Sequence, residues 1–375
     1  MASSPRIRFG GFSDAWEQRK VSELCSISTG KSNTQDKVED GEYPFYVRSA
    51  IIERSNKYLY DEEAVLTVGD GVGTGKVFHY VSGKYDLHQR CYRMYDFTDE
   101  LNVHYFYHTF SKLFYKRVMA MTAKTSVDSV RLEMIADMEI PCPKIKEQEK
   151  IGQYLDNLDN LITLHQRKYD KLIVMKKSML EKMFPKNGET VPEVRFAGFT
   201  DAWEQRKVSE LFRVTRGYVL AATQTETTKT DEKPYPVYSS QTKDKGLMGY
   251  YKDYLYEDAI TWTTDGANAG TVNYRAGKFY CTNVCGVLLS NEVKANQMIA
   301  EALNSVAKGY VSYVGNPKLM NNVMADIVIQ IPTQAEEREQ LSSFFAKLDN
   351  LITLHQSKLE KLQNLKKSML KQMFV

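Results

Sequence analysis

The chain contains the same frame twice. Arg8–Leu24 and Arg195–Leu211 are identical at 15 of 17 positions, and Leu158–Phe184 and Leu348–Phe374 are identical at 19 of 27 positions. The segments between these matched stretches, about 130 residues each, are largely different. A repeat of about 190 residues is too long for a solenoid unit and predicts a duplicated domain with its connector. A chain whose matched segments repeat while the segments between them differ is expected to present two related surfaces to two related but unequal targets.

Size and composition are those of an ordinary globular protein. The 375 residues are enough for two or three domains, and the hydrophobic content of 42% and charged content of 26% are typical. No run approaches 18 apolar residues, and the N-terminus lacks an apolar signal segment, so neither a membrane helix nor a signal peptide is expected. Five scattered cysteines suit a reducing, cytoplasmic location. The net charge of +3 neither demands nor excludes a polyanionic partner.

The middle of each half is rich in Tyr, Val, Thr and Gly with frequent turn signals, which favours a mixed, mostly β domain with a few helices. The Asp-Gly pairs at 70–71 and 265–266 mark tight turns between strands. We therefore divide the chain into a first domain at 1–146, a first helix at 147–184, a linker at 185–194, a second domain at 195–336 and a second helix at 337–375.

Each half ends in a long predicted helix. The region from Glu147 to Met183 contains no proline, and its apolar residues repeat in heptads in the same phase as those of the second copy. Such a pattern over four heptads predicts coiled-coil packing, with a rod of roughly 55 Å. The predicted seam comprises Leu155, Leu158, Ile162, His165, Tyr169 and Leu172 in the first helix and Leu348, Ile352, His355, Leu359 and Leu362 in the second.

The two helices are expected to pack on each other. If identical sequences make identical contacts, the first opening block docks where the second helix ends, as the second block docks near the end of the first. The expected fold class is α+β: two similar, mixed, mostly β domains separated by two long antiparallel α-helices that form an intramolecular coiled coil with pseudo-two-fold symmetry.

Familiar catalytic and metal motifs do not fit. In Gly69–Lys76 (GDGVGTGK), Asp70 stands where a phosphate-binding loop needs glycine, and Val77 replaces the magnesium-binding Ser or Thr, so we interpret it as a glycine-rich turn. Cys281 and Cys285 have no second pair nearby and are interpreted as core residues. We predict no catalytic residue, no metal site and no cofactor in this chain.

The stretch from Leu101 to Val127 has no acidic residue and interleaves basic with aromatic residues, and Ala302 to Ala325 is also free of acids. An amphipathic helix with core aromatics explains most of the rings, but basic, amide and hydroxyl side chains on loops fit phosphate contacts and base-edge readout in double-stranded DNA. The hypothetical DNA contacts are Lys31, Asn33, Arg48, Lys76, Gln89, Arg90, Lys124, Ser126 and Arg131 in the first domain and Arg216, Gln224, Gln241, Lys243, Asn268, Asn283, Lys318 and Asn321 in the second.

Several motifs recur in the same order in both halves: the opening block ending in WEQRKVSEL, the middle glycine turn, the helix approaches IPCPKIKEQEKI and IPTQAEEREQL, and the helix tails LDNLITLHQ…KKSML…MF. Over essentially its whole length the chain resembles the specificity subunit of Type I restriction–modification systems. The resemblance implies two target recognition domains, each reading one half of a bipartite asymmetric DNA sequence. The helices would act as a ruler and as the docking surface for two adenine-methyltransferase subunits, which would hold S-adenosylmethionine, and motor–nuclease subunits would complete the complex.

Two other interpretations stay open from the residues. One is an adaptor whose twin domains bind protein or glycan on a helical spacer, without DNA. The other, a duplicated enzyme, is the weakest, because no catalytic constellation recurs in both halves.

Overall fold

The computed structural model describes residues 5–71, 73–121, 129–186, 188–240 and 243–374. Its contacts divide the chain into two units: unit 1 is Met1–Gln166 with Ser357–Val375, and unit 2 is Arg167–Gln356. Two long helices, α4 (Ile145–Met183) and α8 (Ala335–Met373), each contribute a segment to both units.

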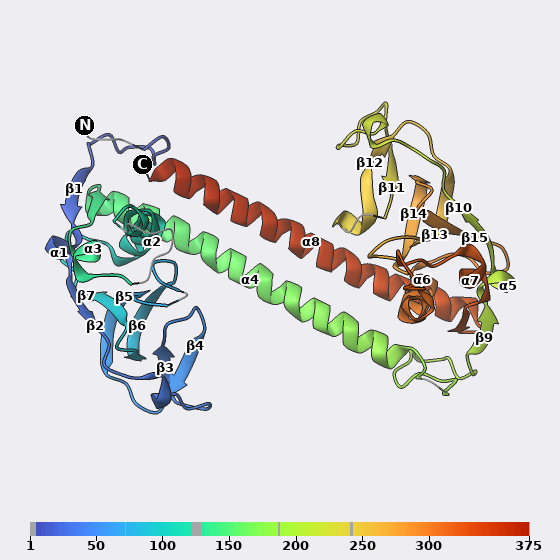
Figure 1. The fold of residues 1–375 in the computed structure, drawn as a ribbon, viewed down its shortest axis with the longest axis horizontal. Helices are drawn as coiled ribbons and strands as arrows, with labels where there is room; N and C mark the ends of the chain where they lie inside the picture. Colours follow the sequence, from blue (N-terminus) through green and yellow to red (C-terminus); the bar gives the residue numbers. More distant parts are fainter. Residues whose placement is uncertain (1–4, 72, 122–128, 187, 241–242, 375) are drawn as a thin grey trace. The chain divides into compact units, whose positions relative to one another are not determined.

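Unit 1 is built on a six-stranded sheet in the order β2-β7-β5-β6-β3-β4 (Figure 1). The strands are β2 (Ser26–Thr29), β3 (Tyr43–Tyr46), β4 (Ile52–Ser55), β5 (Tyr60–Val68), β6 (Phe78–Leu87) and β7 (Cys91–Tyr95). Neighbours are antiparallel except β3 and β6, which are parallel. One face of the sheet packs against α2 (Val103–Ala120), whose aromatic residues lie in the main core, and the opposite face covers a second, smaller core. The remaining elements are β1 (Glu17–Lys20), α1 (Val21–Leu24), η1 (Thr34–Asp36), α3 (Leu132–Ala136) and β8 (Glu139–Cys142), with β1 paired to β8.

Unit 2 repeats this topology, with a sheet in the order β10-β15-β13-β14-β11-β12 and one parallel pair, β11 with β14. The strands are β10 (Phe212–Arg216), β11 (Tyr235–Tyr238), β12 (Leu247–Tyr251), β13 (Tyr256–Thr263), β14 (Val272–Cys281) and β15 (Cys285–Ser290). The other elements are β9 (Glu204–Lys207), α5 (Val208–Leu211), η2 (Ala222–Gln224), η3 (Lys243–Gly246), α6 (Gln297–Val306), η4 (Ala307–Tyr310), α7 (Asn321–Asp326) and β16 (Val328–Ile331), with β9 paired to β16. The predicted architecture of two mixed, mostly β domains and two long helices is therefore confirmed.

Within each unit the segments of α4 and α8 pair in opposite directions. In unit 1, Lys366 of α8 donates to Asp159 of α4 at 2.6 Å, and in unit 2, Lys176 of α4 donates to Asp349 of α8 at 2.6 Å. The residues predicted for the seam are placed as follows: Leu155, Leu158, Leu348 and Leu359 are buried, and Ile162, His165, Tyr169, Leu172, Ile352, His355 and Leu362 are half-buried. The helices begin at Ile145 and Ala335, each two residues before the starts expected from the sequence.

The opening block of each half caps the end of a long helix. The backbone N–H groups of Arg6 and Ile7 donate to the carbonyl of Gln372 at 2.9 and 3.2 Å, and that of Val194 donates to Lys182 at 2.9 Å. These bonds satisfy carbonyl groups that a helix C-terminus leaves without partners. The predicted docking of each block at a helix end is thus confirmed in both units.

A buried ion pair joins each opening block to the start of a long helix, which is α4 in unit 1 and α8 in unit 2. Arg8 forms a two-bond pair with Glu147 at 2.7 and 2.8 Å, and Arg195 forms the same pair with Glu337 at 2.7 Å for both bonds. Glu147 and Glu337 are each only 1% exposed. Such bidentate pairs fix geometry, so the frame of the two halves is held by matching contacts.

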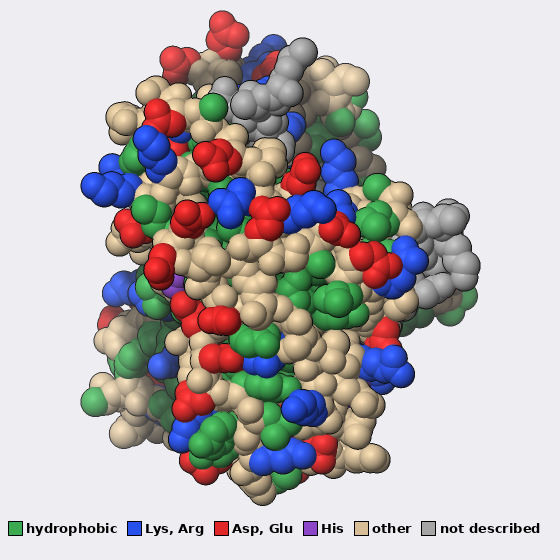
Figure 2. All heavy atoms as spheres, turned by 90° about the vertical axis from the view of Figure 1, so that its left-hand side faces the viewer, with side chains coloured by type: hydrophobic (Ala, Val, Ile, Leu, Met, Phe, Trp, Pro, Cys, Tyr) green, Lys and Arg blue, Asp and Glu red, His purple; other side chains and the backbone are tan. Residues whose placement is uncertain are grey.

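The face of unit 1 that carries α1 and β1 shows acidic and basic side chains interspersed (Figure 2). Arg19 pairs there with Glu23 at 3.1 Å and with Glu100 at 3.0 Å, and Lys20 pairs with Asp137 at 3.1 Å. Because Arg19 and Lys20 are already paired with carboxylates, they add little net positive potential to this face.

Candidate nucleic-acid interface

In unit 1 several loops meet at one end of the six-stranded sheet. The glycine turn between β5 and β6 is the centre: the N–H of Gly69 donates to Arg90 at 2.8 Å, and the N–H of Val130 donates to Gly69 at 2.6 Å. The loop after β2 joins them, since the N–H of Gln89 donates to Ser32 at 2.8 Å. These backbone bonds bring together segments that are 37 to 98 residues apart along the chain, measured between Ser32, Gly69 and Val130.

Four of the hypothetical DNA contacts line one hollow of about 280 Å³ at this end: Asn33, Arg48, Gln89 and Arg90. Asp70 lies between the two arginines, with its carboxylate 3.4 Å from Arg48 and 3.6 Å from Arg90. Gln89 donates to Asn33 at 2.5 Å. Because a guanidinium carries five donors, pairing with Asp70 leaves each arginine able to bind a base edge or a phosphate.

His88 also lines this hollow. It is 4% exposed, and its Nδ1 accepts the backbone N–H of Arg90 at 3.0 Å. Burial, together with the positive charges of Arg48 and Arg90, lowers the pKa of His88. A neutral imidazole that accepts at Nδ1 is therefore favoured near pH 7, and it orients the backbone that carries Arg90.

The other candidates of unit 1 lie around this cluster. Lys31 is exposed, and its N–H donates to Leu87 at 3.1 Å, beside the His88 loop. Lys76 is exposed at the end of the glycine turn, with its Nζ 5.0 Å from the ring centre of Tyr115. Arg131 is exposed next to Val130 and pairs with Glu133 at 3.3 Å. Lys124 and Ser126 lie outside the described residues.

The corresponding end of unit 2 has different chemistry. Asp265 occupies the place of Asp70, but it pairs with Lys318 at 3.7 Å instead of with arginines. Asn268 donates to the carbonyl of Ser240 at 3.1 Å. Asn283 is exposed, and the adjacent Val284 accepts the N–H of Thr264 at 3.0 Å. The structure thus brings Asn268, Asn283 and Lys318 to one end of the sheet.

Three further candidates differ in how close they come. Arg216 is exposed at the end of β10, and the next residue, Gly217, donates to Cys285 at 3.0 Å, near the same loops. Asn321 is half-buried at the start of α7, two residues after Leu319. Gln224 ends η2, where its backbone carbonyl accepts a hydrogen bond from Lys233 at 3.1 Å. Gln241 lies outside the described residues, and only the backbone of Lys243, in η3, is described.

Sequence reasoning missed two features of this end of the sheet. One is the carboxylate, Asp70 or Asp265, which interacts with candidate residues in each unit. The other is a hairpin in unit 2, closed by two backbone hydrogen bonds between Ser312 and Lys318 at 2.8 and 2.9 Å. In this hairpin the side chains of Tyr313 and Val314 are 69% and 93% exposed. The Gly-Asn-Pro sequence at 315–317 is a turn signal that could have revealed this hairpin.

The aromatic residues of the acid-free stretch in unit 1 do not form a stacking surface. Tyr105, Phe106, Phe110 and Phe114 of α2 are all fully buried. The amphipathic-helix interpretation is therefore the correct one for these four rings.

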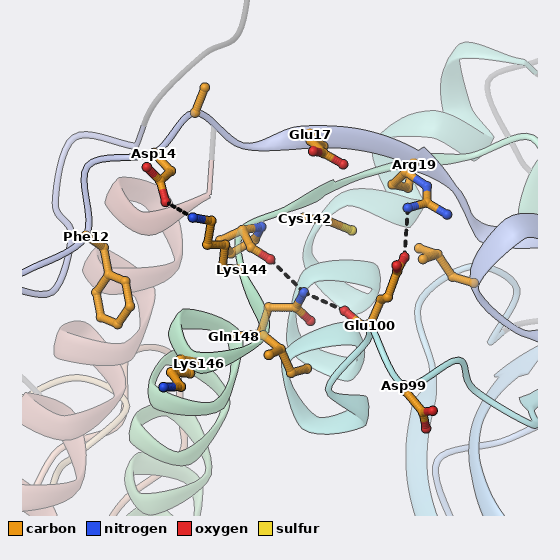
Figure 3. A pocket seen from close by; sticks show the side chains of 14 residues that line it. Phe12, Asp14, Glu17, Arg19, Asp99, Glu100, Cys142, Lys144, Lys146 and Gln148 are labelled. Atoms are coloured by element: carbon orange, nitrogen blue, oxygen red, sulfur yellow. Dashed lines mark hydrogen bonds and ion pairs between the residues drawn. The ribbon is translucent and has the colours of Figure 1, made fainter.

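A cavity of about 720 Å³ lies between the opening block and the start of α4 in unit 1 (Figure 3). Several of its polar side chains are engaged: Asp14 pairs with Lys144 at 2.6 Å, and Gln148 donates to the carbonyls of Pro143 and Glu100. Its lining includes Phe12, Asp14 and Arg19, which belong to the frame that both halves share. Part of this lining is thus common to both halves of the chain, unlike the loops at the end of the sheet.

Across the described ranges, no group of three His, Cys, Asp or Glu side chains is placed to hold a metal ion. Within the same residues, no helix has the length and apolar character needed to cross a bilayer.

Comparison with known proteins gives a consistent answer. A family model, the Type I restriction modification DNA specificity domain, matches residues 13–173 and 200–364. A Mycoplasma pneumoniae protein named as a type I specificity subunit, S.MpnORF289P N-terminus, is 37% identical over 131 residues, covering 34% of this chain and 68% of its relative. Another from that organism, S.MpnORF615P, is 30% identical over 203 residues, covering 53% and 76%.

The fold has a solved counterpart. The crystal structure of a Type-I restriction-modification system S subunit from M. genitalium matches with a TM-score of 0.76 at 16% identity, covering 100% of this chain and 99% of that one. Two copies of one family domain, in the order seen here, cover most of the sequence. The chain therefore belongs to the family of Type I restriction–modification DNA specificity subunits, the non-catalytic members of those systems.

Proposed function

We propose that unit 1 and unit 2 each read one half of a bipartite, asymmetric sequence in double-stranded DNA. The reading surface of each unit is the loop end of its six-stranded sheet. Phosphate contacts would come from the exposed lysines, and base contacts from the arginine and amide side chains.

One observation supports this proposal above all others: the same end of the same sheet carries different chemistry in the two units. Unit 1 presents Arg48 and Arg90 around Asp70, with the Gln89–Asn33 amide pair beside them. Unit 2 presents Lys318 on Asp265, with Asn268 nearby. Arginine favours guanine and asparagine favours adenine in the major groove, so the two half-sites are expected to differ in sequence.

The long helices are proposed to set the spacing between the half-sites and to dock two adenine-methyltransferase subunits. Leu161 and Leu164 of α4 are 43% and 46% exposed, and Leu351 and Leu354 at the matching places of α8 are 43% and 46% exposed. Paired apolar residues exposed to the same degree suit two copies of one partner. If so, replacing Leu161 and Leu164 by Ser removes one bound methyltransferase of two, as native mass spectrometry would count.

In this proposal S-adenosylmethionine is held by the methyltransferase partners, and motor–nuclease subunits complete a restricting complex in the cytoplasm. The alternative of an adaptor with twin ligand-binding domains and no DNA target is not favoured, because both halves match a DNA specificity domain.

The decisive experiment identifies the methylated target in cells that carry the chain with its methyltransferase, and then measures binding to that duplex and to a scrambled one. Arg90→Gln should cost about 1–3 kcal/mol and relax one base position in one half-site, and Asn268→Ala should do the same in the other half-site. Arg19→Gln, on the charge-paired face of unit 1, is the matched control and should leave discrimination unchanged. If the variants of both units affected the same half-site, or neither, the proposal would be wrong.

A further inference from the structure

The smaller core under the sheet contains more polar residues in unit 2 than in unit 1. In unit 1, Ala64 pairs across the strands with Val81, and in unit 2 the equivalent Ala259 pairs with Arg275. Val68 opposite Cys91 corresponds in the same way to Thr263 opposite Cys285. Val81 and Val68 of unit 1 are thus replaced in unit 2 by the buried Arg275 and by Thr263. Leu66 of unit 1 is likewise replaced, by Thr261.

Arg275 is a buried cation whose contacts are all neutral. It is 7% exposed; its Nε donates to the hydroxyl of Thr261 at 3.0 Å and its Nη2 to the carbonyl of Lys245 at 2.7 Å. Its guanidinium lies 3.7 Å from the ring centre of Tyr238. Among the described residues no carboxylate lies within ion-pair distance of it. A buried charge with no counter-charge is costly, and burial correspondingly lowers the pKa of Arg275.

Arg275 lines a cavity of about 250 Å³ in unit 2. The other polar groups around this cavity are hydroxyls, amides and one further cation: Ser239, Thr261, Thr263, Asn268, Thr271, Asn273 and Lys245. Its described lining contains no Asp or Glu. Lys245 contributes its backbone carbonyl to Arg275, whereas its side chain is 57% exposed and its ammonium group lies 3.4 Å from the carboxylate of Asp349. A cavity with one buried, unpaired cation and several neutral donors has the composition of an anion site.

The turn that borders this cavity is conformationally strained. Asp244 and Lys245 have positive φ angles of 49° and 52°, which non-glycine residues rarely adopt. The carbonyl that Arg275 binds belongs to Lys245, so the arginine helps to hold the strained turn in place. Local strain of this kind persists where the surrounding structure enforces it, and it accumulates at ligand sites.

We propose that this cavity of unit 2 binds a phosphate group, with Arg275 as its principal contact. A guanidinium matches the oxygens of phosphate in two parallel hydrogen bonds, and the threonine hydroxyls and asparagine amides supply the neutral donors. Asn268 lies both in this cavity and among the candidate DNA contacts, so the phosphate can come from the DNA backbone, an assignment that rests on the proposed function. Unit 1 has Val81 in place of Arg275 and so lacks this buried cation.

The first arm of the test uses inorganic phosphate. The thermal unfolding midpoint of the full chain is measured in phosphate and in chloride at equal ionic strength and pH, for the wild type, Arg275→Met, Arg275→Lys and the control Lys278→Met. Lys278 is an exposed residue of the same strand. Phosphate should raise the midpoint of the wild type and of the control but not that of Arg275→Met. In chloride, Arg275→Met should unfold at the same temperature or higher, because it removes an uncompensated buried charge.

The second arm uses duplex DNA. The slope of log affinity against log salt concentration should fall by about 0.9 for Arg275→Met if the cavity takes one backbone phosphate. A change in the first arm alone identifies free phosphate as the ligand, and a change in the second arm alone identifies the backbone phosphate; either supports the site.

The proposal fails if the wild type gains nothing from phosphate and the salt slope is unchanged, or if Arg275→Met simply unfolds earlier with no effect in either arm. Should Arg275→Met fail to fold, Arg275→Lys and the phosphate titration of the wild type decide in the same way. Failure of the proposed function is recognised separately, because the wild type would then show no preference for any DNA sequence while the phosphate arm still tests the cavity.

Discussion

At the scale of single residues, one carboxylate organises the candidate interface of unit 1. Asp70 is positioned by the glycine turn and pairs with Arg48 and Arg90, both of which are about half exposed or more. A carboxylate at a DNA interface repels phosphates. The role we propose for Asp70 is therefore to hold the side chains that discriminate bases. In the proposed function, this arrangement lowers the affinity for DNA in general and raises the selectivity for the target sequence.

Replacing Asp70 by Asn should therefore raise affinity for scrambled DNA and lower the ratio of target to scrambled binding. The exposed ion pairs contribute little to folding, so the thermal midpoint should stay within the range of a surface substitution. Fluorescence anisotropy with both duplexes measures the ratio, and Asp61→Asn, an exposed carboxylate of β5, is the control. An unchanged ratio in Asp70→Asn would show that Asp70 has no role in discrimination.

A second residue-scale feature is the carboxylate of Asp156 on α4, which binds His108 at 2.8 Å and His104 at 2.6 Å. Burial acts to raise the pKa of Asp156, but the hydrogen bond from His108 and the nearby positive charges outweigh it, so that this pKa lies below its usual value. The place equivalent to Asp156 in unit 2 is Ala346, so this cluster belongs to unit 1 alone.

Because the folded pKa of Asp156 is lowered, its contribution to stability is present above the unfolded pKa and is lost as pH falls through the folded one. The difference in unfolding free energy between wild type and Asp156→Asn should thus be larger at pH 6 than at pH 3. Urea unfolding at both pH values measures it. A difference that grew on acidification would contradict the assignment.

At the scale of elements, α4 and α8 carry one lysine each within the helix seam, and the two units pair it differently. In unit 2, Lys176 binds both Asp349 and Glu301 at 2.6 Å, and Asp349 also accepts from Gln297 at 3.2 Å. In unit 1, Lys366 binds Asp159, and the side chain of Asp159 is 35% exposed, whereas that of Asp349 is 15% exposed. The same heptad position is thus supported by a larger buried network in unit 2.

We expect Asp349→Ala to destabilise the protein by about 2 kcal/mol, since it leaves buried donors short of an acceptor. Asp159→Ala should cost roughly 1 kcal/mol or less, because water can replace a more exposed partner. Chemical denaturation followed by circular dichroism gives both values. Equal costs in the two variants would mean that burial of the network does not matter.

The helices and the turns were the elements that sequence could predict. Heptad spacing and the proline-free interval located α4 and α8, and the Asp-Gly pairs located the turns after β5 and β13, because these signals are local. The grouping of Arg48, Asp70 and Arg90 could not be predicted, since it depends on the strand order of the sheet. Arg275 was missed for a related reason: nothing in its neighbours reveals that the residue opposite it, Ala259, faces a second core.

At the scale of the whole molecule, the two halves use equivalent contacts at both of their boundaries. Arg8 and Arg195 bind Glu147 and Glu337, and the N–H groups of Ile7 and Val194 bind the ends of α8 and α4. In unit 2 the helix end and the opening block are joined by the linker, and in unit 1 they are held together by these contacts without a covalent link.

A circular permutant should therefore fold and bind DNA as the wild type does. Phe374 would be joined to Arg6 by a short Gly/Ser linker, with the chain opened after Lys186. The added linker and the new chain ends disrupt none of these anchoring contacts. We therefore expect an unfolding midpoint within a few degrees of that of the wild type, measured by calorimetry. Opening the chain after Gln166 instead would cut α4 in the middle and should abolish the cooperative transition.

The near-identity of the two opening blocks also has a genetic consequence. Since Arg8–Leu24 and Arg195–Leu211 make the same anchoring contacts, a crossover between genes within either block would deliver a foreign loop set onto anchors that already fit it. In the proposed function, a single recombination event would then change the DNA sequence that the protein recognises. The hybrid protein would fold at once, because its anchoring contacts are unchanged.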